Sequence, residues 1–334
     1  MSLERLKKRD SYFDFLRGVA IIFVIGIHTV STNLDFSSIE GISVIVIRQL
    51  IGCAVPIFLA ISGYFISKKS VCNLKDYTSF LKHQIPIVYL PCLFWSIPYL
   101  LLSIKDGTPI LNSIILFLLC GMSIYYFINS IIQCYVLSPI AKKANVLVLV
   151  LLLLISVIWS YMHVKYNLIS RAGLPLIVYA APFPNLFVFF VLGCWLGIKE
   201  RNYSFYMALV CCLLSLGLCV YETYYHYENS NLVILGMKVS SHIFDFFAVL
   251  LLFHKKTKDL YKENIITVFI SRLGISSFTI YLCHMLIAIF LFKVNFLNSS
   301  WLLKWFSLLI ATSIFVYMLK LILPCRFWKF IGLR

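Results

Sequence analysis

The chain of 334 residues is 61% hydrophobic and only 13% charged, and it carries a formal net charge of +16. A soluble protein averages roughly 45–50% apolar and about 25% charged residues, because its surface needs polar groups. The composition therefore excludes an ordinary soluble enzyme, a secreted disulfide scaffold and a disordered chain. It predicts an integral membrane protein, in which each crossing takes about 20 apolar residues.

Apolar segments follow one another along the whole chain, and their lengths predict about ten transmembrane helices. The predicted fold is an all-α, polytopic helical bundle that occupies residues 1–334 as a single domain, with no appended soluble domain. The fourth segment contains Gly121 and is long enough to form two pieces, and residues 264–273 fit a short interfacial helix ahead of the ninth segment. In chain order the predicted segments are 12–33, 42–66, 82–104, 110–139, 145–162, 182–198, 204–223, 232–253, 275–293 and 304–323.

The excess of basic residues, 29 against 13 acidic ones, indicates the orientation of these segments. With the N-terminus in the cytoplasm and the sides alternating, nineteen basic residues fall in cytoplasmic segments and four in outside loops. Lysine and arginine accumulate in the cytoplasmic loops of membrane proteins. We therefore predict that both termini are cytoplasmic. Because the basic residues are scattered over separate segments, we predict no nucleic-acid partner.

The first segment carries three ionisable side chains, Asp14, Arg17 and His28. Such groups are costly inside a bilayer and mark functional sites. Asp14 and Arg17 can pair on one face, and Arg17 and His28 share a face because eleven residues make about three helical turns, or about 16 Å of rise. The pattern predicts a polar track from the cytoplasmic surface to the middle of the membrane. The structural alternatives are an interfacial anchor for Arg17, a core role for His28 and a helix-end charge for Asp14.

Later helices hold further candidates. Lys238, His242 and Asp245 lie on one helical face, and two interpretations of this face stay open. It forms a polar wall for a substrate, or Asp245 makes a structural ion pair with Arg48. His284 either contributes to a site or packs in the core. The seven histidines show no metal-ligand spacing, so we predict no metal site.

Several segments resemble a known family. Residues 13–22, FDFLRGVAII, followed by His28, resemble the first helix of the membrane-bound acyltransferase 3 family, whose signature is an arginine, ten residues and a histidine. Further segments are similar to family motifs and follow in the family's order across almost the whole chain. They are VPIFLAISGYF at 55–65, the stretch at 124–139, the helix at 189–197 and LGISSFTIYLCH at 273–284.

The resemblance implies an enzyme that transfers an acyl group, usually acetyl, from a cytoplasmic coenzyme A thioester to a hydroxyl of an extracytoplasmic or lipid-linked surface glycan. It implies that Arg17 binds the phosphates of coenzyme A and that His28 acts as general base or as an acylated relay. Asp14 then orients Arg17. The alternative is a glycolipid or polysaccharide transporter or flippase without acyl-transfer activity, because intramembrane charges alone suit either class.

The expected donor is acetyl-CoA, and Lys82, Arg272 and Tyr126 are further candidates for binding it. Residues 80–91 lack the arginine pair that the family commonly has, and Tyr126 stands where the family has a tryptophan. For Lys82 and Arg272 the alternative is membrane anchoring. The candidates for binding the acceptor sugar are His284, Asp245, His242 and Arg48.

The expected partners follow from this assignment. They are acyl-CoA, membrane lipids and a surface glycan or undecaprenyl-linked sugar, with O antigen, other lipopolysaccharide sugars and enterobacterial common antigen as the classes that the resemblance suggests. The expected location is the bacterial cytoplasmic (inner) membrane.

Overall fold

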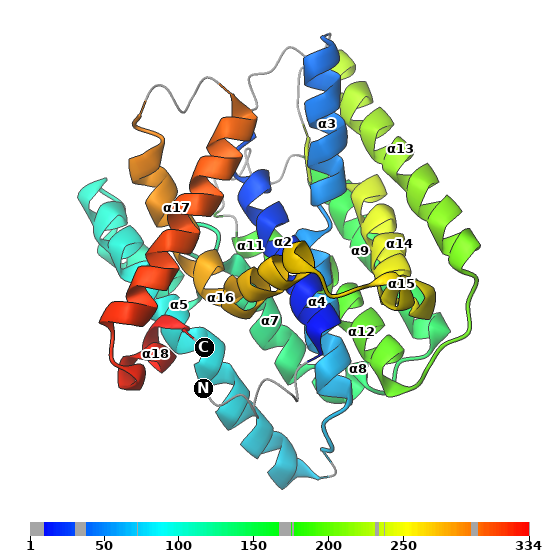
Figure 1. The fold of residues 1–334 in the computed structure, drawn as a ribbon, viewed down its shortest axis with the longest axis horizontal. Helices are drawn as coiled ribbons and strands as arrows, with labels where there is room; N and C mark the ends of the chain where they lie inside the picture. The colour runs from blue at the N-terminus through cyan, green and yellow to red at the C-terminus, as the bar shows by residue number, and fades with distance from the viewer. Residues whose placement is uncertain are drawn as a thin grey trace.

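The computed structural model describes residues 10–30, 38–71, 73–166, 175, 177–230, 234–236, 238–294 and 300–333. These residues form α-helices and no strands (Figure 1), which confirms the all-α class. In chain order the helices are α2 (Ser11–Ile27), α3 (Ile39–Ile51), α4 (Ala54–Ser67), α5 (Leu74–Lys105), α6 (Ile110–Leu118), α7 (Tyr126–Val136), α8 (Ser138–Ala141), α9 (Val146–Tyr166), α11 (Ile177–Ala180), α12 (Phe183–Ile198), α13 (Phe205–Ser230), α14 (Val239–Phe253), α15 (Lys255–Leu260), α16 (Ile265–Leu291), α17 (Trp301–Ile322) and α18 (Cys325–Ile331).

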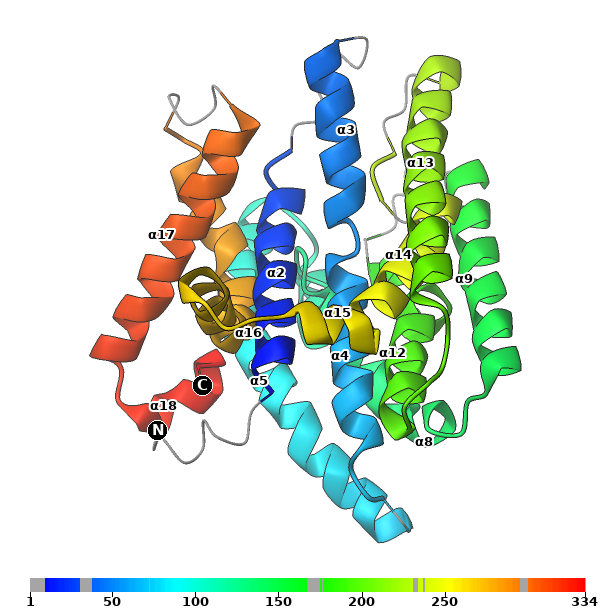
Figure 2. The same ribbon diagram turned by 45° about the vertical axis from the view of Figure 1, so that its right-hand side comes forward.

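The helices have the lengths and compositions of a polytopic membrane protein. Within the described residues, six helical segments are long and apolar enough to cross a membrane, and α3 and α4 together form one of them. Most helices run side by side along one direction, with α9 and α13 at one edge and α17 at the opposite edge (Figure 2). These outer helices expose many large hydrophobic side chains, as lipid-facing helices do. The count of ten crossings and the cytoplasmic termini stay predictions.

The central helix α2 packs tightly against α16 through two glycines. A Cβ atom at Gly18 would lie 2.0 Å from the carbonyl oxygen of Ile270, and one at Gly274 would lie 1.8 Å from that of Asp14. Only a residue without a side chain permits such a close backbone approach, which is typical of helix pairs in membranes. The contact fixes α16 against the part of α2 that carries Asp14.

A second glycine contact joins α4 to α12. A Cβ atom at Gly193 would lie 2.0 Å from the carbonyl oxygen of Ala60, and one at Gly63 would lie 2.1 Å from that of Phe190. Because α4 also packs against α2, the two close-packed pairs form the inner part of the bundle, and the remaining helices surround them.

Two expectations about single elements have different outcomes. The fourth apolar segment is divided as predicted, because α6 ends before Gly121 and α7 begins after it, and Cys120 and Ser123 adopt positive φ angles in the turn. The separate interfacial helix at 264–273 is wrong. Asn264 and Thr267 form a capping box that starts α16, and the helix then continues through Gly274, which serves the contact with α2 rather than a break.

Candidate functional site

The three ionisable residues of the first helix lie along α2 in the interior of the bundle. Asp14 and Arg17 belong to the first turns of the helix, and His28 is its C-terminal cap residue. Arg17 and His28 are eleven positions apart, which corresponds to about 16 Å along the axis. The two side chains therefore reach different cavities.

The first cavity, with a volume of about 450 Å³, is lined by Asp14 and Arg17. Arg17 Nη1 donates to Asp14 Oδ1 at 2.7 Å, and its guanidinium carbon lies 5.2 Å from the centre of the Phe65 ring. The carboxylate is almost fully buried whereas a quarter of the Arg17 side chain is exposed. The ion pair holds the guanidinium at the cavity wall, where an anionic ligand can reach it.

Further polar residues that the sequence analysis missed line the same cavity. Among them are Lys69, just beyond the end of α4, Gln84 on α5, and Asp10, which caps α2 and accepts a hydrogen bond from Lys258 Nζ at 2.7 Å. Desolvation by the surrounding protein and the neighbouring ammonium of Lys142 lower the pKa of Lys69. A bound anion would offset both effects. The first cavity therefore combines two cations, Arg17 and Lys69, with apolar walls and with two carboxylates, Asp10 and Asp14, each of which pairs with a basic side chain. Because both carboxylates are paired, the cavity suits a ligand that has an anionic end and a long uncharged part.

The second cavity, with a volume of about 120 Å³, is lined by His28. Four of the predicted site residues reach this cavity from other helices. Arg48 comes from α3, Tyr126 begins α7, and the remaining two come from α14: His242 and Asp245. Arg48 interacts electrostatically with both Tyr126 and Asp245. Folding thus gathers a base, a cation, a phenol and a carboxylic acid around a small space.

Several polar atoms at the second cavity have unused hydrogen-bonding capacity. Arg48 Nε, Ser241 Oγ and Asp245 Oδ1 are buried and have no hydrogen-bond partner among the described residues. The described ion pairs do not join Arg48 to Asp245, so the structural ion pair considered for these two residues does not form as a direct contact. Buried polar atoms are nearly always satisfied in folded proteins, and these atoms therefore mark a place for a polar ligand.

The two cavities adjoin each other. Both are lined by the same four residues, Val24, Val55, Phe127 and Tyr281. The ring centres of Phe127 and Tyr281 lie 5.5 Å apart, and the Tyr281 hydroxyl donates to the carbonyl oxygen of Ile124 at 2.6 Å. The wall between the Arg17 cavity and the His28 cavity is therefore one layer of side chains that is anchored to the turn before α7.

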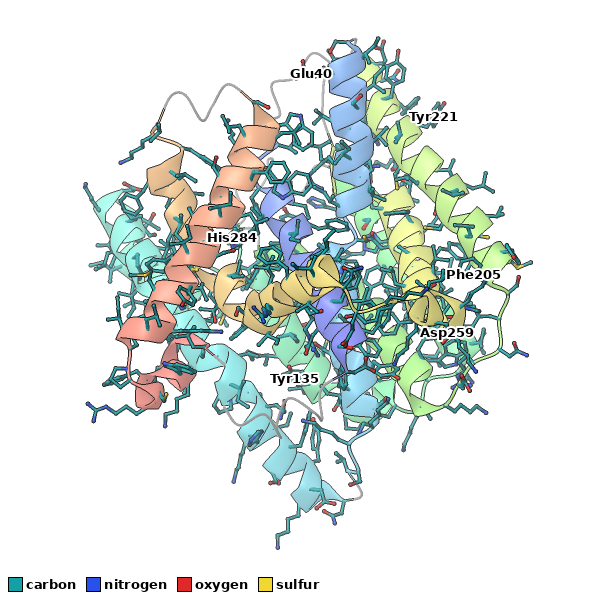
Figure 3. All side chains as sticks on the ribbon, in the orientation of Figure 1. Glu40, Tyr135, Phe205, Tyr221, Asp259 and His284 are labelled. Carbon is teal, nitrogen blue, oxygen red and sulfur yellow. The ribbon has the colours of Figure 1, made fainter. Side chains whose placement is uncertain are left out.

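His284 comes from α16 (Figure 3), and its ring lies beside that of His28. Its ring is fully buried, and its centre lies 5.4 Å from that of His28. His284 lines neither cavity. His284 therefore lies next to His28, but it does not contact a ligand in either cavity.

The other predicted site residues either lie outside both cavities or form hydrogen bonds to other protein groups. Lys82 on α5 and Arg272 on α16 are exposed and line neither cavity. His242 lines the second cavity, but its Nε2 lies 3.0 Å from the carbonyl oxygen of Asn185, and its Nδ1 lies 3.2 Å from Ser160 Oγ. Its ring is thus held between helices.

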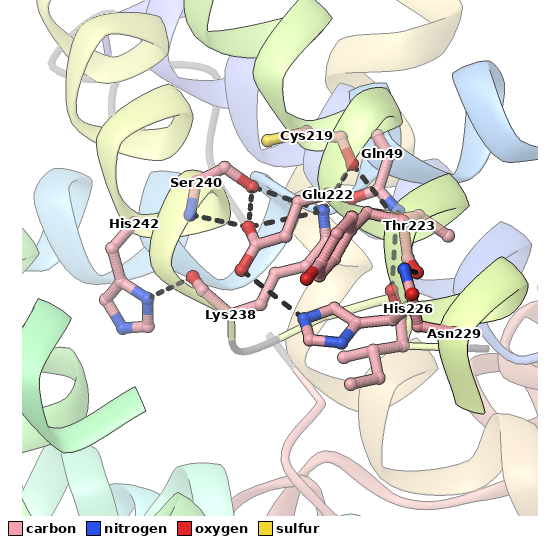
Figure 4. Close-up of polar contacts among 11 residues, drawn as sticks. Gln49, Cys219, Glu222, Thr223, His226, Asn229, Lys238, Ser240 and His242 are labelled. Carbon is pink, nitrogen blue, oxygen red and sulfur yellow. Dashed lines mark hydrogen bonds and ion pairs between the residues drawn. The ribbon is translucent and has the colours of Figure 1, made fainter. Parts of the chain in front are cut away.

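Lys238 takes part in a polar cluster between α13 and α14 and does not line the second cavity (Figure 4). Its Nζ donates to the carbonyl oxygen of Cys219 and to Ser240 Oγ, and it lies 4.0 Å from Glu222 Oε2. The Ser240 hydroxyl also donates to Glu222. The cluster compensates a completely buried ammonium and holds together the two helices beside Asp245.

The arrangement can support the transfer of a chemical group from a ligand in the first cavity to a ligand in the second, where the two meet at the shared wall. A neutral histidine can accept a proton from a hydroxyl, and the cations of the first cavity can bind phosphate. No group of three or more histidine, cysteine or carboxylate side chains that could hold a metal ion occurs in the part of the chain that the structure describes.

Comparison with known proteins gives one match. A protein-family model described as an acyltransferase domain matches residues 10–321, which include both cavities. No curated protein and no solved structure matches the chain.

Proposed function

Because the chain belongs to the acyltransferase 3 family and is therefore an enzyme that transfers acyl groups, we propose that it moves an acetyl group from cytoplasmic acetyl-CoA to a hydroxyl of an extracytoplasmic or lipid-linked surface glycan. The observation that carries the proposal is the pair of adjoining cavities along α2. One contains Arg17 and the other contains His28. Family membership favours this enzyme over the transporter or flippase that was the alternative.

The first cavity receives the donor. Arg17 and Lys69 bind phosphates of coenzyme A, since guanidinium and ammonium groups bind phosphate strongly. The pantetheine arm lies along the apolar wall, and the distance of about 16 Å from Arg17 to His28 along α2 matches an extended arm. The thioester carbonyl then reaches the wall shared with the second cavity, and Asp14 holds Arg17 in place.

His28 acts as the general base. It takes the proton of the acceptor hydroxyl, and the oxygen attacks the thioester carbonyl to form a C–O bond. The tetrahedral intermediate collapses as the C–S bond breaks, and the thiolate of coenzyme A leaves with the proton from His28. In the second mechanism that the residues allow, a nitrogen of His28 attacks the thioester, a C–N bond forms as the C–S bond breaks, and the thiolate of coenzyme A leaves. The acceptor oxygen then attacks the acylated His28, the C–N bond breaks as the C–O bond forms, and the proton of the hydroxyl passes to the released imidazole.

The second cavity receives the sugar. Arg48 and Asp245 offer a donor and an acceptor for its hydroxyl groups, and Tyr126 and His242 complete the polar wall. The small volume of about 120 Å³ suits one sugar hydroxyl with a short acyl group rather than a long acyl chain. Tyr126 is thereby proposed on the acceptor side, whereas the family motif suggested a donor-binding role.

The proposed setting is the bacterial inner membrane, with an O antigen, enterobacterial common antigen or another undecaprenyl-linked glycan as acceptor. The test is the glycan composition of cells with the intact gene, without it, and with the His28→Ala variant. We expect an O-acetyl ester in the first sample and its loss in the other two, measured by nuclear magnetic resonance before and after mild alkali. Identical O-acetylation in all three samples would contradict the proposal.

A further inference from the structure

The contact between α2 and α16 brings two histidines together. His28 caps the end of α2, and His284 lies about five turns into α16. Their ring centres are 5.4 Å apart with an angle of 42° between the planes. This separation leaves room for one N–H···N hydrogen bond between the ring edges. The glycine contacts hold the same two helices close together toward the other end of α2.

The hydrogen bonds of His284 determine which of its nitrogens carries a proton. Nδ1 lies 2.8 Å from the carbonyl oxygen of Tyr281 and 3.2 Å from that of Ile280. A carbonyl oxygen only accepts hydrogen bonds, so Nδ1 is the protonated nitrogen. In a neutral imidazole Nε2 is then an acceptor. This Nε2 is buried and has no partner among the described residues, although its ring is next to that of His28.

We propose that His284 is a positioning residue for His28, an inference that rests on the proposed function. Nε2 of His284 accepts a hydrogen bond from one ring nitrogen of His28. The other nitrogen of His28 is then unprotonated and faces the second cavity, where it takes the proton of the acceptor hydroxyl. When His28 becomes charged during the reaction, its hydrogen bond to His284 strengthens because the donor is then an imidazolium.

The role of His284 differs from that of the aspartate in a Ser-His-Asp triad only in charge. In the triad the orienting group selects the tautomer of the base and stabilises its charged form. A neutral imidazole selects the tautomer fully, but it stabilises the charged form of the base only weakly. It also avoids placing an uncompensated carboxylate in the apolar interior between α2 and α16.

Two substitutions separate positioning from a purely structural role. His284→Gln keeps a polar atom near the place of Nε2 and removes the Nδ1 donor. His284→Asn keeps a polar atom near the place of Nδ1, where it can bond to Tyr281, and removes the acceptor near His28. The assay follows radiolabelled acetyl from acetyl-CoA into the glycan fraction of membranes, with the amount of folded protein measured by gel filtration of a fluorescent fusion.

We expect His284→Gln to keep kcat within about three-fold of the wild type. His284→Asn is expected to lower kcat by about ten- to hundred-fold with an unchanged KM for acetyl-CoA, because His28 then samples both tautomers and loses its partner. A His284→Asn enzyme as active as His284→Gln would overturn the inference. Equal transfer by the wild type and His28→Ala would instead overturn the proposed function.

A measurement on the wild-type protein covers the case in which neither variant folds. Nitrogen chemical shifts of isotope-labelled histidine distinguish the two neutral tautomers of His28, with the His28→Ala protein providing the assignment. We expect a single tautomer. A mixture of both tautomers at neutral pH would overturn the positioning role of His284.

Discussion

Arg17 and His28 sit on one helical face, yet the protein surrounds them differently. Arg17 is paired with a buried carboxylate and stays partly exposed in the larger cavity. His28 shares the smaller cavity with Arg48 and Asp245, whose buried polar atoms are unsatisfied by the described residues. The first environment favours a charged ligand, and the second favours a neutral ligand with many hydroxyl groups.

Arg17→Gln is expected to raise the KM for acetyl-CoA by about ten- to hundred-fold with a smaller change in kcat. The loss of a hydrogen bond to a charged group is worth about 1.5–3 kcal/mol, and glutamine can still donate to Asp14. Initial rates of radiolabelled acetyl transfer measure both constants. Lys75→Ala, an exposed change on α5 outside both cavities, is the matched control. An unchanged KM in Arg17→Gln would exclude the phosphate role.

The residues of α2 could be predicted because helical periodicity fixes which side chains share a face. The same periodicity could not show that Arg48, Tyr126 and Asp245 reach His28, because their helices meet only through tertiary packing. Lys69 was missed since it follows the last turn of α4, where periodicity ends. Lys82 illustrates the converse: it has the right charge and approximate position, but its neighbour two residues later, Gln84, is the one that faces the cavity.

At the level of elements, the site depends on how closely α2 and α16 approach. The Gly274 contact lies at Asp14, and the His284 contact lies near the other end of α2. One helix pair therefore positions both the donor cation and the base. A shift of α16 would move His284 relative to His28 and change the wall that Tyr281 contributes to both cavities.

Gly274→Ala is expected to destabilise the protein by about 1–3 kcal/mol, because its Cβ atom would overlap the Asp14 carbonyl oxygen and force the helices apart. Gly217→Ala on α13 is the matched control, since nothing lies within 4 Å of a Cβ atom there. Alanine at this position should stabilise the helix by about 0.5–1 kcal/mol. Thermal unfolding in detergent, followed by fluorescence, compares the two. Equal midpoints for both variants would contradict the packing argument.

The elements themselves were predictable to different degrees. Lengths of apolar sequence indicate where helices occur, because a membrane requires them to be long and uncharged. They do not show where an apolar segment changes direction, so only Gly121 pointed to the division between α6 and α7. The predicted separation of residues 264–273 from the ninth segment is wrong because α16 continues through Gly274, which makes a close contact with α2.

On the scale of the whole molecule, the two cavities lie one after the other along the long direction of α2. The proposed function requires the Arg17 cavity to open toward the cytoplasm, where acetyl-CoA is made. The distribution of basic residues in the sequence predicts the same orientation, with both termini in the cytoplasm. The distribution of basic residues and the position of Arg17 on α2 are independent features, and both assign the same end of α2 to the cytoplasmic side.

Reporter fusions test this orientation. Alkaline phosphatase fused after Gly107, in the connection between α5 and α6, is expected to be active, because this connection is predicted to lie outside. The same reporter at the C-terminus should be inactive, and green fluorescent protein there should fluoresce. The reverse pattern at either position would contradict the predicted alternation of sides.

The most direct test of the account is acyl transfer in isolated membranes with radiolabelled acetyl-CoA. Wild type, His28→Ala and His163→Ala are compared at equal amounts of folded protein, and His163 on α9 is the control because it lines neither cavity. We expect the wild type and His163→Ala to label the glycan fraction equally and His28→Ala to be at least about a hundred-fold slower. Equal labelling by His28→Ala and the wild type would contradict the account.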